Sequence, residues 1–292
     1  MMKFQLTDEV FLFDFLCTKF SESSKNKIKK WVKNQCVSYN GEVVTDLRKK
    51  LQAGGELTVD THGGNREADY NISFKIYYED PQLIVVEKPV GISTAGQESN
   101  RTMLNVVNAY LEKKSKGLSR AFVVHRLDKE VSGVLLFARS RKTMDWLKEH
   151  WQQTEKFYLA LVEGRPEKPE GTIQGWLREG AKQKVYSTSS EIGAKYAITH
   201  YRIIRELDNY SLLEVKIDTG RKNQIRVHLS EIGCPIVGDY KYGASPYPLR
   251  RVRLHACSFT FPHPLTGKMI RIESPMPKNF LVLKNEDENY KN

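Results

Sequence analysis

Cysteine is scarce in this chain, and its four cysteines form no recognisable pattern. Cys17, Cys36, Cys234 and Cys257 are scattered, without a C-x-x-C pair or a zinc-like spacing. Disulfide frameworks and zinc sites are recognised by such spacings. We therefore predict reduced, mostly structural cysteines and no metal site.

Long apolar runs are also missing. The N-terminus MMKFQLTDEV lacks the apolar run of a signal peptide, and no stretch approaches the roughly 18 apolar residues that span a bilayer. The composition, 40% hydrophobic and 28% charged, is typical of a soluble globular protein. We predict a cytoplasmic monomer without membrane contact.

The signatures of several common enzyme classes are absent as well. The chain contains no Walker loop, no H-E-x-x-H and no G-x-S-x-G. This excludes the usual phosphate-loop, zinc-protease and serine-hydrolase interpretations.

Basic residues outnumber acidic ones. The net charge is +11 and the isoelectric point is about 9.3. Lysine and arginine gain by displacing counterions from a phosphate backbone, so a polyanionic partner is one interpretation. A merely basic, soluble surface is the other, and charge alone leaves both open.

Residues 9 to 60 have the pattern of a compact unit. Apolar residues at helical spacing predict two helices, with Leu12, Phe15, Leu16 and Phe20 on the first and Ile28, Trp31 and Val32 on the second. Ser23 or Ser24 can cap the second helix. In VSYNGEVV, Asn40-Gly41 favours a hairpin turn because both positions tolerate positive φ, and ELTVD predicts a further strand.

Between residues 21 and 50, eight basic residues oppose three acidic ones. A solvated helix face would explain this. A helix-helix-hairpin unit with a basic second helix also resembles the S-four-like RNA-binding domain. The resemblance implies such a domain at residues 1–60, and we predict that Lys29, Lys30 and Lys33 contact RNA.

A second domain follows the polar, glycine-containing linker predicted at residues 61–75. Strand-like segments outnumber helical ones between residues 76 and 284 and do not alternate regularly with them. We therefore predict an α+β fold with a mixed, largely antiparallel sheet and flanking helices. Residues 285–292 form a polar tail.

The most distinctive segment is AFVVHRLDKEVSGVLLFA, in which two apolar runs flank a charged loop. Composition alone favours an ordinary charged turn. However, HRLDKEVSG resembles the H-R-L-D-x-x-T-S-G signature of the RluA-type pseudouridine synthases. The resemblance implies that Asp128 is catalytic.

Other segments resemble the same family, in the family's order. These are EKPVGISTAG (87–96), EKFYLALVEG (155–164), TGRKNQIRVHLSEIGCPIVGDYKYG (219–243) and the later RLHACSFTFPHPLTGK. The resemblance spans residues 76 to 277 and implies a pseudouridine synthase catalytic domain. The chain departs from the pattern at Val131 and at Lys222-Asn223, which puts local hydrogen bonding and the choice of RNA in doubt.

Pseudouridine formation breaks a glycosidic bond, rotates the uracil and rejoins it through carbon 5, without a cofactor. Asp128 can attack the anomeric carbon or take a proton from the neighbouring ribose carbon, and the sequence leaves both routes open. Because burial alone would raise its pKa, the carboxylate needs a nearby cation. The resemblance places Arg226 there; a phosphate contact or surface ion pair is the alternative.

The resemblance also assigns roles to Tyr158 and Arg126. Tyr158 would stack on the extracted uracil and assist late proton removal, unless it is a packed core residue. Arg126 would fill the vacated stack or hold the flipped nucleotide, unless it forms a structural ion pair. We further predict RNA contacts for His125, Lys129, Arg221 and Lys222.

These features together predict an RNA pseudouridine synthase that acts on large-subunit ribosomal RNA, with transfer RNA as an alternative. A non-catalytic RNA-binding protein would explain the charge but not the ordered motifs. A two-carboxylate glycosidase would need a second acid beside Asp128, and only Glu130 is near in sequence.

Overall fold

The structure is a computed structural model that describes residues 2–61, 73–96, 101–115, 119–246 and 251–282. The chain divides into two compact units, Met1–Asn71 and Ile72–Asn292. The domain boundaries at residues 60, 75 and 284 stay predictions. Most of the predicted linker and the whole predicted tail lie outside the described residues. No helix in the described ranges is long and apolar enough to cross a membrane.

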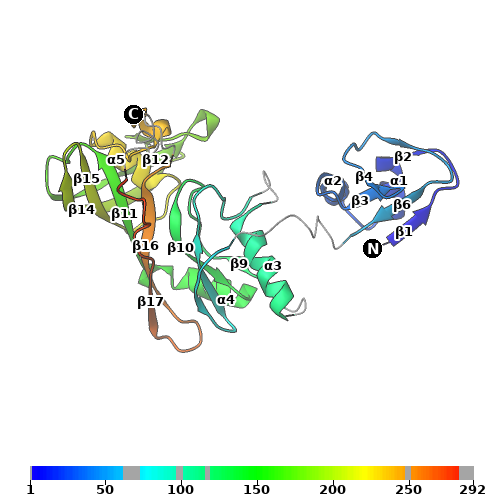
Figure 1. Ribbon diagram of the computed structural model, residues 1–292, viewed down its shortest axis with the longest axis horizontal. Helices are drawn as coiled ribbons and strands as arrows, with labels where there is room; N and C mark the ends of the chain where they lie inside the picture. Colours follow the sequence, from blue (N-terminus) through cyan, green and yellow to red (C-terminus); the bar gives the residue numbers. More distant parts are fainter. Residues whose placement is uncertain (1, 62–72, 97–100, 116–118, 247–250, 283–292) are drawn as a thin grey trace, which may run out of the picture. The chain divides into compact units, whose positions relative to one another are not determined.

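The N-terminal unit consists of two helices and short strands (Figure 1). Its elements are β1 (Met2–Gln5), β2 (Val10–Phe11), α1 (Leu12–Lys19), α2 (Lys25–Lys33), β3 (Val37–Tyr39), β4 (Glu42–Val43), β5 (Lys50–Leu51) and β6 (Glu56–Val59). One sheet has the order β1-β6-β3-β4, and β2 pairs separately with β5. The predicted helices, hairpin and ELTVD strand are confirmed, whereas β1, β2 and β5 have no counterpart in the sequence prediction.

Local sequence explains these elements. The Ser24 hydroxyl caps α2 by accepting a hydrogen bond from the Lys27 amide at 3.3 Å. Asn40 and Gly41 have φ values of 51° and 85°, as a type I′ hairpin turn requires. The buried faces of the two helices pack together in the core of the unit, which leaves the lysines of α2 exposed to solvent.

The second unit is built around one large sheet. Its helices are α3 (Met103–Ser115), α4 (Arg141–Glu149) and α5 (Gln224–Glu231). Its strands are β7 (Ile76–Glu79), β8 (Leu83–Lys88), β9 (Phe122–Val123), β10 (Ser132–Ala138), β11 (Glu155–Glu163), β12 (Glu170–Glu179), β13 (Val185–Thr188), β14 (Lys195–Leu207), β15 (Tyr210–Ile217), β16 (Leu254–Pro262) and β17 (Met269–Glu273).

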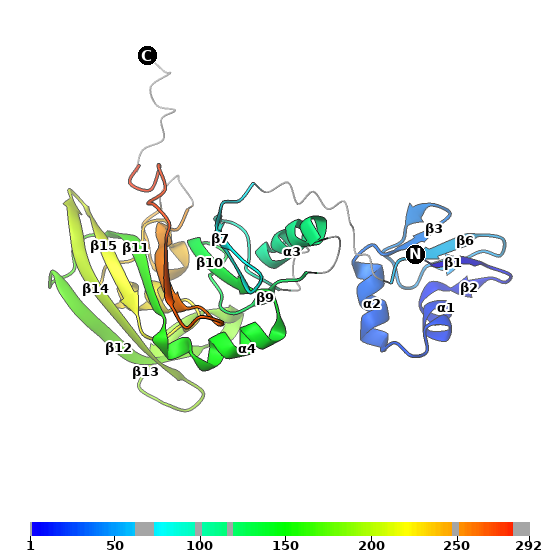
Figure 2. The same cartoon turned by 90° about the horizontal axis from the view of Figure 1, so that it is seen from below.

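The sheet has the order β13-β12-β14-β15-β11-β16-β10-β8-β7, with β17 beside β16 and β9 beside β10. Among the described strands, β10 and β16 run parallel and the other neighbours are antiparallel. Figure 2 shows β12 to β15 at one end of the sheet and α3 and α4 beside the other end. The predicted mixed, largely antiparallel α+β fold is confirmed.

Apolar residues at helical spacing predict helices in SRKTMDWLKEHW, with Trp151 on the apolar side, and in QIRVHLSEIG, with Ile232 as a core anchor. Both details are wrong. Ile232, an expected core anchor of α5, lies just beyond the helix and is 36% exposed, whereas Val227 is 3% exposed. Residues on all sides of this short helix are buried. The sequence therefore does not show the alternation of apolar and polar faces that would identify its core residues. Trp151 lies beyond α4, in a short 3-10 turn.

Gly133, in the HRLDKEVSG segment, permits the parallel contact between β10 and β16. Its φ is 119°, and a Cβ atom there would lie 2.2 Å from the Ala256 carbonyl oxygen. We expect Gly133→Ala to lower the free energy of unfolding by about 3 kcal/mol, because backbone strain and overpacking both contribute. Denaturant titration of the full chain would measure this.

Gly175 provides the matched control. It lies in β12, and a Cβ atom there would meet nothing within 4 Å. Gly175→Ala is expected to change stability by less than about 1 kcal/mol. Equal effects of the two substitutions would mean that the close approach at Gly133 does not constrain the residue.

Candidate active site

Asp128 lies in the loop that joins β9 to β10, and the segment after β8 holds this loop. The Thr94 hydroxyl accepts a hydrogen bond from the Leu127 amide at 3.0 Å and donates to the Leu127 carbonyl at 2.9 Å. The Gly91 amide donates to the Lys129 carbonyl at 2.8 Å. EKPVGISTAG therefore contributes hydrogen bonds that fix the backbone on both sides of Asp128.

Arg226, on α5, lies among three carboxylates. Its Nη1 is 3.6 Å from Asp128 Oδ2 and 3.1 Å from Glu130 Oε2. Its Nε and Nη2 donate to the two Asp239 oxygens at 2.6 and 2.8 Å. The predicted meeting of Arg226 and Asp128 is present, but the closest partner of the arginine is Asp239.

Asp239 was not among the predicted site residues. It is 1% exposed and Arg226 is 4% exposed, so this two-bond pair is removed from water. The Tyr242 ring lies 5.2 Å from the Arg226 guanidinium carbon. The only sequence signal for these two residues is their place in GDYKYG, at the end of the family-like block.

The surroundings of Asp128 shift its pKa. Burial raises the pKa above its ordinary value, the Arg226 charge lowers it, and the Glu130 charge raises it; burial prevails. For Arg226, burial acts to lower the pKa, but the hydrogen bonds and charge of Asp239 raise it overall. Arg226 is therefore a fixed cation that offsets part of the burial cost at Asp128.

Tyr158 lies on β11 and lines the same pocket as Asp128 and Arg226. The volume of this pocket is about 70 Å³. The tyrosine is 7% exposed. Burial and the nearby Asp128 charge raise its pKa, so the hydroxyl holds its proton. The structure thus brings the three predicted catalytic residues into one pocket.

Comparison with known proteins agrees with this geometry. The family model described as "RNA pseudouridylate synthase" matches residues 82–231, just over half of the chain. The chain belongs to this family. A second model, the S4 domain, matches residues 12–57. The protein is therefore an RNA pseudouridine synthase, an isomerase, with an N-terminal S4 domain, as the motifs predict.

Individual relatives cover nearly the whole synthase. It is 31% identical to a ribosomal large subunit pseudouridine synthase D of Haemophilus influenzae, over 92% of this chain and 89% of that protein. It is 32% identical to an uncharacterized RNA pseudouridine synthase of Bacillus subtilis, over 92% and 91%. The fold resembles the human RNA pseudouridylate synthase domain containing 4, with a TM-score of 0.61 and 24% identity, over 70% of this chain and 89% of that one.

A buried lysine of the synthase, Lys88, was also missed by the sequence prediction. Its ammonium donates to the Pro89 and Ile92 carbonyls at 2.9 and 2.8 Å. Burial lowers its pKa to about 7, although the Asp128 and Glu130 charges act in the opposite direction. Lys88 thus bonds to the segment after β8 and interacts with the charges of Asp128 and Glu130 in the neighbouring loop.

The predicted RNA-binding residues fall into different environments. Arg126, Lys129, Arg221 and Lys222 are exposed. Arg126 and Arg221 line the Asp128 pocket, whereas Lys222 is 39% exposed and pairs with Glu179.

The His125 ring lies in an aromatic environment. Its ring packs against Trp151 and Phe259, and its Nε2 accepts a hydrogen bond from the Leu136 amide at 3.0 Å. Burial lowers its pKa to about 3, so the ring is neutral. This position gives the predicted RNA contact of His125 no support.

The departures from the family motif also have structural consequences. Val131 is buried and lines the Asp128 pocket. Asn223 has a φ of 53° just before α5; its side-chain amide donates to the Tyr242 hydroxyl at 2.8 Å, and its oxygen accepts from Arg226 at 3.4 Å. Asn223 therefore helps to hold the arginine.

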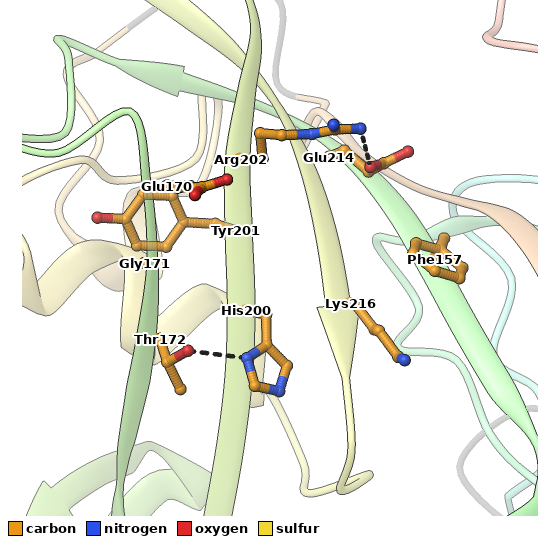
Figure 3. Close-up of a pocket in the computed structure, with 9 residues that line it drawn as sticks. All are labelled: Phe157, Glu170, Gly171, Thr172, His200, Tyr201, Arg202, Glu214 and Lys216. Carbon is orange, nitrogen blue, oxygen red and sulfur yellow. Dashed lines mark hydrogen bonds and ion pairs between the residues drawn. The ribbon is translucent and has the colours of Figure 1, made fainter.

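A larger cavity, of about 420 Å³, lies on the sheet beside β12, β14 and β15 (Figure 3). Its ionisable groups are largely paired: His200 bonds to Thr172 and Asp218, and Arg202 bonds to Glu214. None of the predicted site residues lines it. We therefore place the candidate active site in the smaller Asp128 pocket.

The pKa of Asp128 leads to a prediction for the synthase. We expect activity to depend on the ionised Asp128 carboxylate, so it should fall with decreasing pH through a pKa above the ordinary 3.8. The Glu130 charge raises this pKa, so Glu130→Gln should move the acid limb of kcat/KM to lower pH. Glu130→Asp, which keeps the charge, is the control. An acid limb that stays in place in Glu130→Gln would contradict the electrostatic assignment.

Proposed function

We propose that the synthase isomerises uridines of large-subunit ribosomal RNA, with Asp128 acting on the ribose of a flipped-out uridine. The observation that carries the proposal is the convergence of Asp128, Arg226 and Tyr158 in one pocket. The choice of RNA is supported by relatives that are named ribosomal large subunit pseudouridine synthase D.

Asp128 would begin the reaction by one of two routes. In the first, a carboxylate oxygen bonds to the anomeric carbon while the glycosidic bond breaks and uracil leaves with its electron pair. In the second, the carboxylate takes a proton from the neighbouring ribose carbon, the freed electron pair forms the double bond of a glycal, and the glycosidic bond breaks so that uracil leaves with its electron pair. Both routes require a negative carboxylate, and the Arg226 cation at 3.6 Å supports that charge.

Tyr158 would serve the late steps. After uracil rotates and rejoins the ribose through carbon 5, that carbon must lose a proton. Because the Tyr158 hydroxyl holds its own proton, it can accept another only by passing the first to a neighbouring base. Asp128, whose charge contributes to the raised pKa of Tyr158, is the nearby candidate.

The uridine must leave its stack to reach this small pocket, at a cost of a few kcal/mol. Arg126 is exposed and lines the pocket, so it suits a contact with the flipped nucleotide or with the vacated stack. Lys29, Lys30 and Lys33, exposed on α2, would add affinity for the phosphate backbone.

Mapping of pseudouridine would test the substrate. Total RNA from cells that lack the protein would be incubated with the purified full chain, and every new pseudouridine would be located by sequencing. We expect new sites in large-subunit ribosomal RNA. New sites confined to transfer RNA would favour the alternative substrate, and an RNA population without new sites would contradict the proposed function.

The lysines of α2 allow a second test. Replacing Lys29, Lys30 and Lys33 together by alanine should weaken RNA binding and reduce the slope of log K against log salt by up to about 2.7, since each of three phosphate contacts contributes about 0.7–0.9. The matched control replaces three exposed lysines of the catalytic unit, Lys142, Lys148 and Lys168. If both triple variants change the slope equally, the lysines of α2 have no special role.

A monomeric state and a cytoplasmic location stay predictions. Light scattering of the purified protein and fractionation of cells would test them. A stable dimer, or recovery with the membrane fraction, would contradict them.

A further inference from the structure

A second pocket adjoins the Asp128 pocket. It has a volume of about 210 Å³, and its lining includes Leu177, Val185, Lys195, Arg221 and Lys222. Gly220 and Arg221 line both pockets. A Cβ atom at Gly220 would meet nothing within 4 Å, so open space lies where a side chain would otherwise separate them.

The chemistry of this neighbouring pocket suits a nucleotide. Leu177 and Val185 are each 4% exposed and provide an apolar wall on which the face of a base can pack. Lys195, Arg221 and Lys222 are exposed cations. Among the lining residues Glu179, paired with Lys222, is the one acid. Three positive charges against one negative charge favour a phosphate.

The volume is also informative. Sites for independent small molecules usually measure about 300–1,000 Å³, which is more than this pocket offers. A fragment tethered to something bound elsewhere needs no such volume, because the tether supplies a high effective concentration. An RNA strand with its uridine in the Asp128 pocket would supply that tether.

We propose that the neighbouring pocket binds the nucleotide next to the target uridine. This inference rests on the proposed function, because it takes the strand to pass through the Asp128 pocket. The base would lie against Leu177 and Val185, and its phosphate would contact Lys195 and Arg221. The pocket would thereby make activity depend on the sequence or conformation that flanks the uridine.

Contacts connect this pocket to the catalytic arginine. The Val185 amide donates to the Tyr242 hydroxyl at 3.2 Å. The same hydroxyl accepts from Asn223 at 2.8 Å, and the Tyr242 ring lies 5.2 Å from the Arg226 guanidinium carbon. A base that packs on Val185 therefore lies one hydrogen bond away from Tyr242, whose ring lies beside Arg226.

The test compares dissociation constants of the full chain for paired RNAs. The probe is a fragment of large-subunit ribosomal RNA that contains an unmodified uridine at a position that the wild-type protein converts to pseudouridine. One neighbouring nucleotide is either intact or abasic. Binding is measured in the Asp128→Asn background, so that turnover does not interfere. Lys195→Glu reverses the charge beside the pocket, and Lys168→Glu, also at an exposed lysine, is the matched control.

On one side of the uridine, removal of the base should raise the dissociation constant about tenfold in the reference protein. In Lys195→Glu the same removal should have less than about a twofold effect, because the nucleotide no longer occupies the pocket. Lys168→Glu should behave as the reference does. The proposal is overturned if removal of the base leaves the dissociation constant of the Asp128→Asn protein unchanged. It is also overturned if Lys195→Glu shows the same increase as that protein.

Failure of the proposed function gives a different result. In that case the wild-type protein makes no pseudouridine in any ribosomal RNA. A wild-type protein that modifies the ribosomal RNA fragment but shows no effect of the abasic neighbour keeps the proposed function and loses the neighbouring-nucleotide site.

Discussion

The Asp128→Asn protein is expected to form pseudouridine at least about a thousandfold more slowly than the wild type. The amide has nearly the same shape as the carboxylate but neither attacks the anomeric carbon nor takes a proton from the ribose. Single-turnover rates on a ribosomal RNA fragment, with pseudouridine measured by mass spectrometry, would show the loss.

The fold should survive this substitution. Arg226 keeps its two bonds to Asp239 and its contact with Glu130, so no buried cation loses its main partner. Thermal unfolding of the variant and of the wild type should therefore agree closely. A folded Asp128→Asn protein with nearly normal turnover would remove Asp128 from the mechanism.

Asp239→Asn should cause the largest loss of stability among the site variants, about 3–5 kcal/mol. Asp239 and Arg226 are 1% and 4% exposed, so the substitution leaves a buried guanidinium without its two-bond partner. Activity should fall as well, because the freed arginine can turn toward Glu130 and away from its present position beside Asp128. Denaturant titration and single-turnover kinetics would measure the two effects.

Glu130→Gln is the matched control, since it removes another carboxylate from the same guanidinium. The Glu130 side chain is 45% exposed, so its pair with Arg226 should contribute no more than about 1 kcal/mol. If Glu130→Gln destabilises the protein as much as Asp239→Asn does, then burial does not set the strength of these pairs.

The sequence predicts those parts of the fold whose local patterns are strong. The Ser24 cap, the Asn40-Gly41 turn and the loop between two apolar runs all depend on neighbouring residues. The sequence did not predict β12, β13 or β16. The segment of β12, GTIQGW, contains two glycines and no long apolar run, and its pairing with β14 depends on residues far along the chain.

The residues at the centre of the candidate site were predicted from the sequence, but the residue that holds Arg226 in place was not. Asp128, Tyr158 and Arg226 carry recognisable motifs and meet in one pocket. Asp239 follows Arg226 by thirteen residues, and no periodicity connects the two, because a turn and a bridge to β11 return the chain to the helix. His125 illustrates the opposite error: a polar residue in a charged motif serves an aromatic core.

The parallel pairing of β10 with β16 has a consequence for biosynthesis. Ser132 lies opposite His255 and bonds to it at 2.9 Å, although 123 residues separate them. A ribosome that has just made the Asp128 loop must add all of those residues before the loop gains its neighbour. Such distant closure slows folding, and until then the part of the β10 edge that pairs with β16, at Ser132 and Gly133, is open to wrong partners. Maturation of the enzyme should therefore wait for one of its last strands, and chains that end before β16 should be inactive and prone to aggregate.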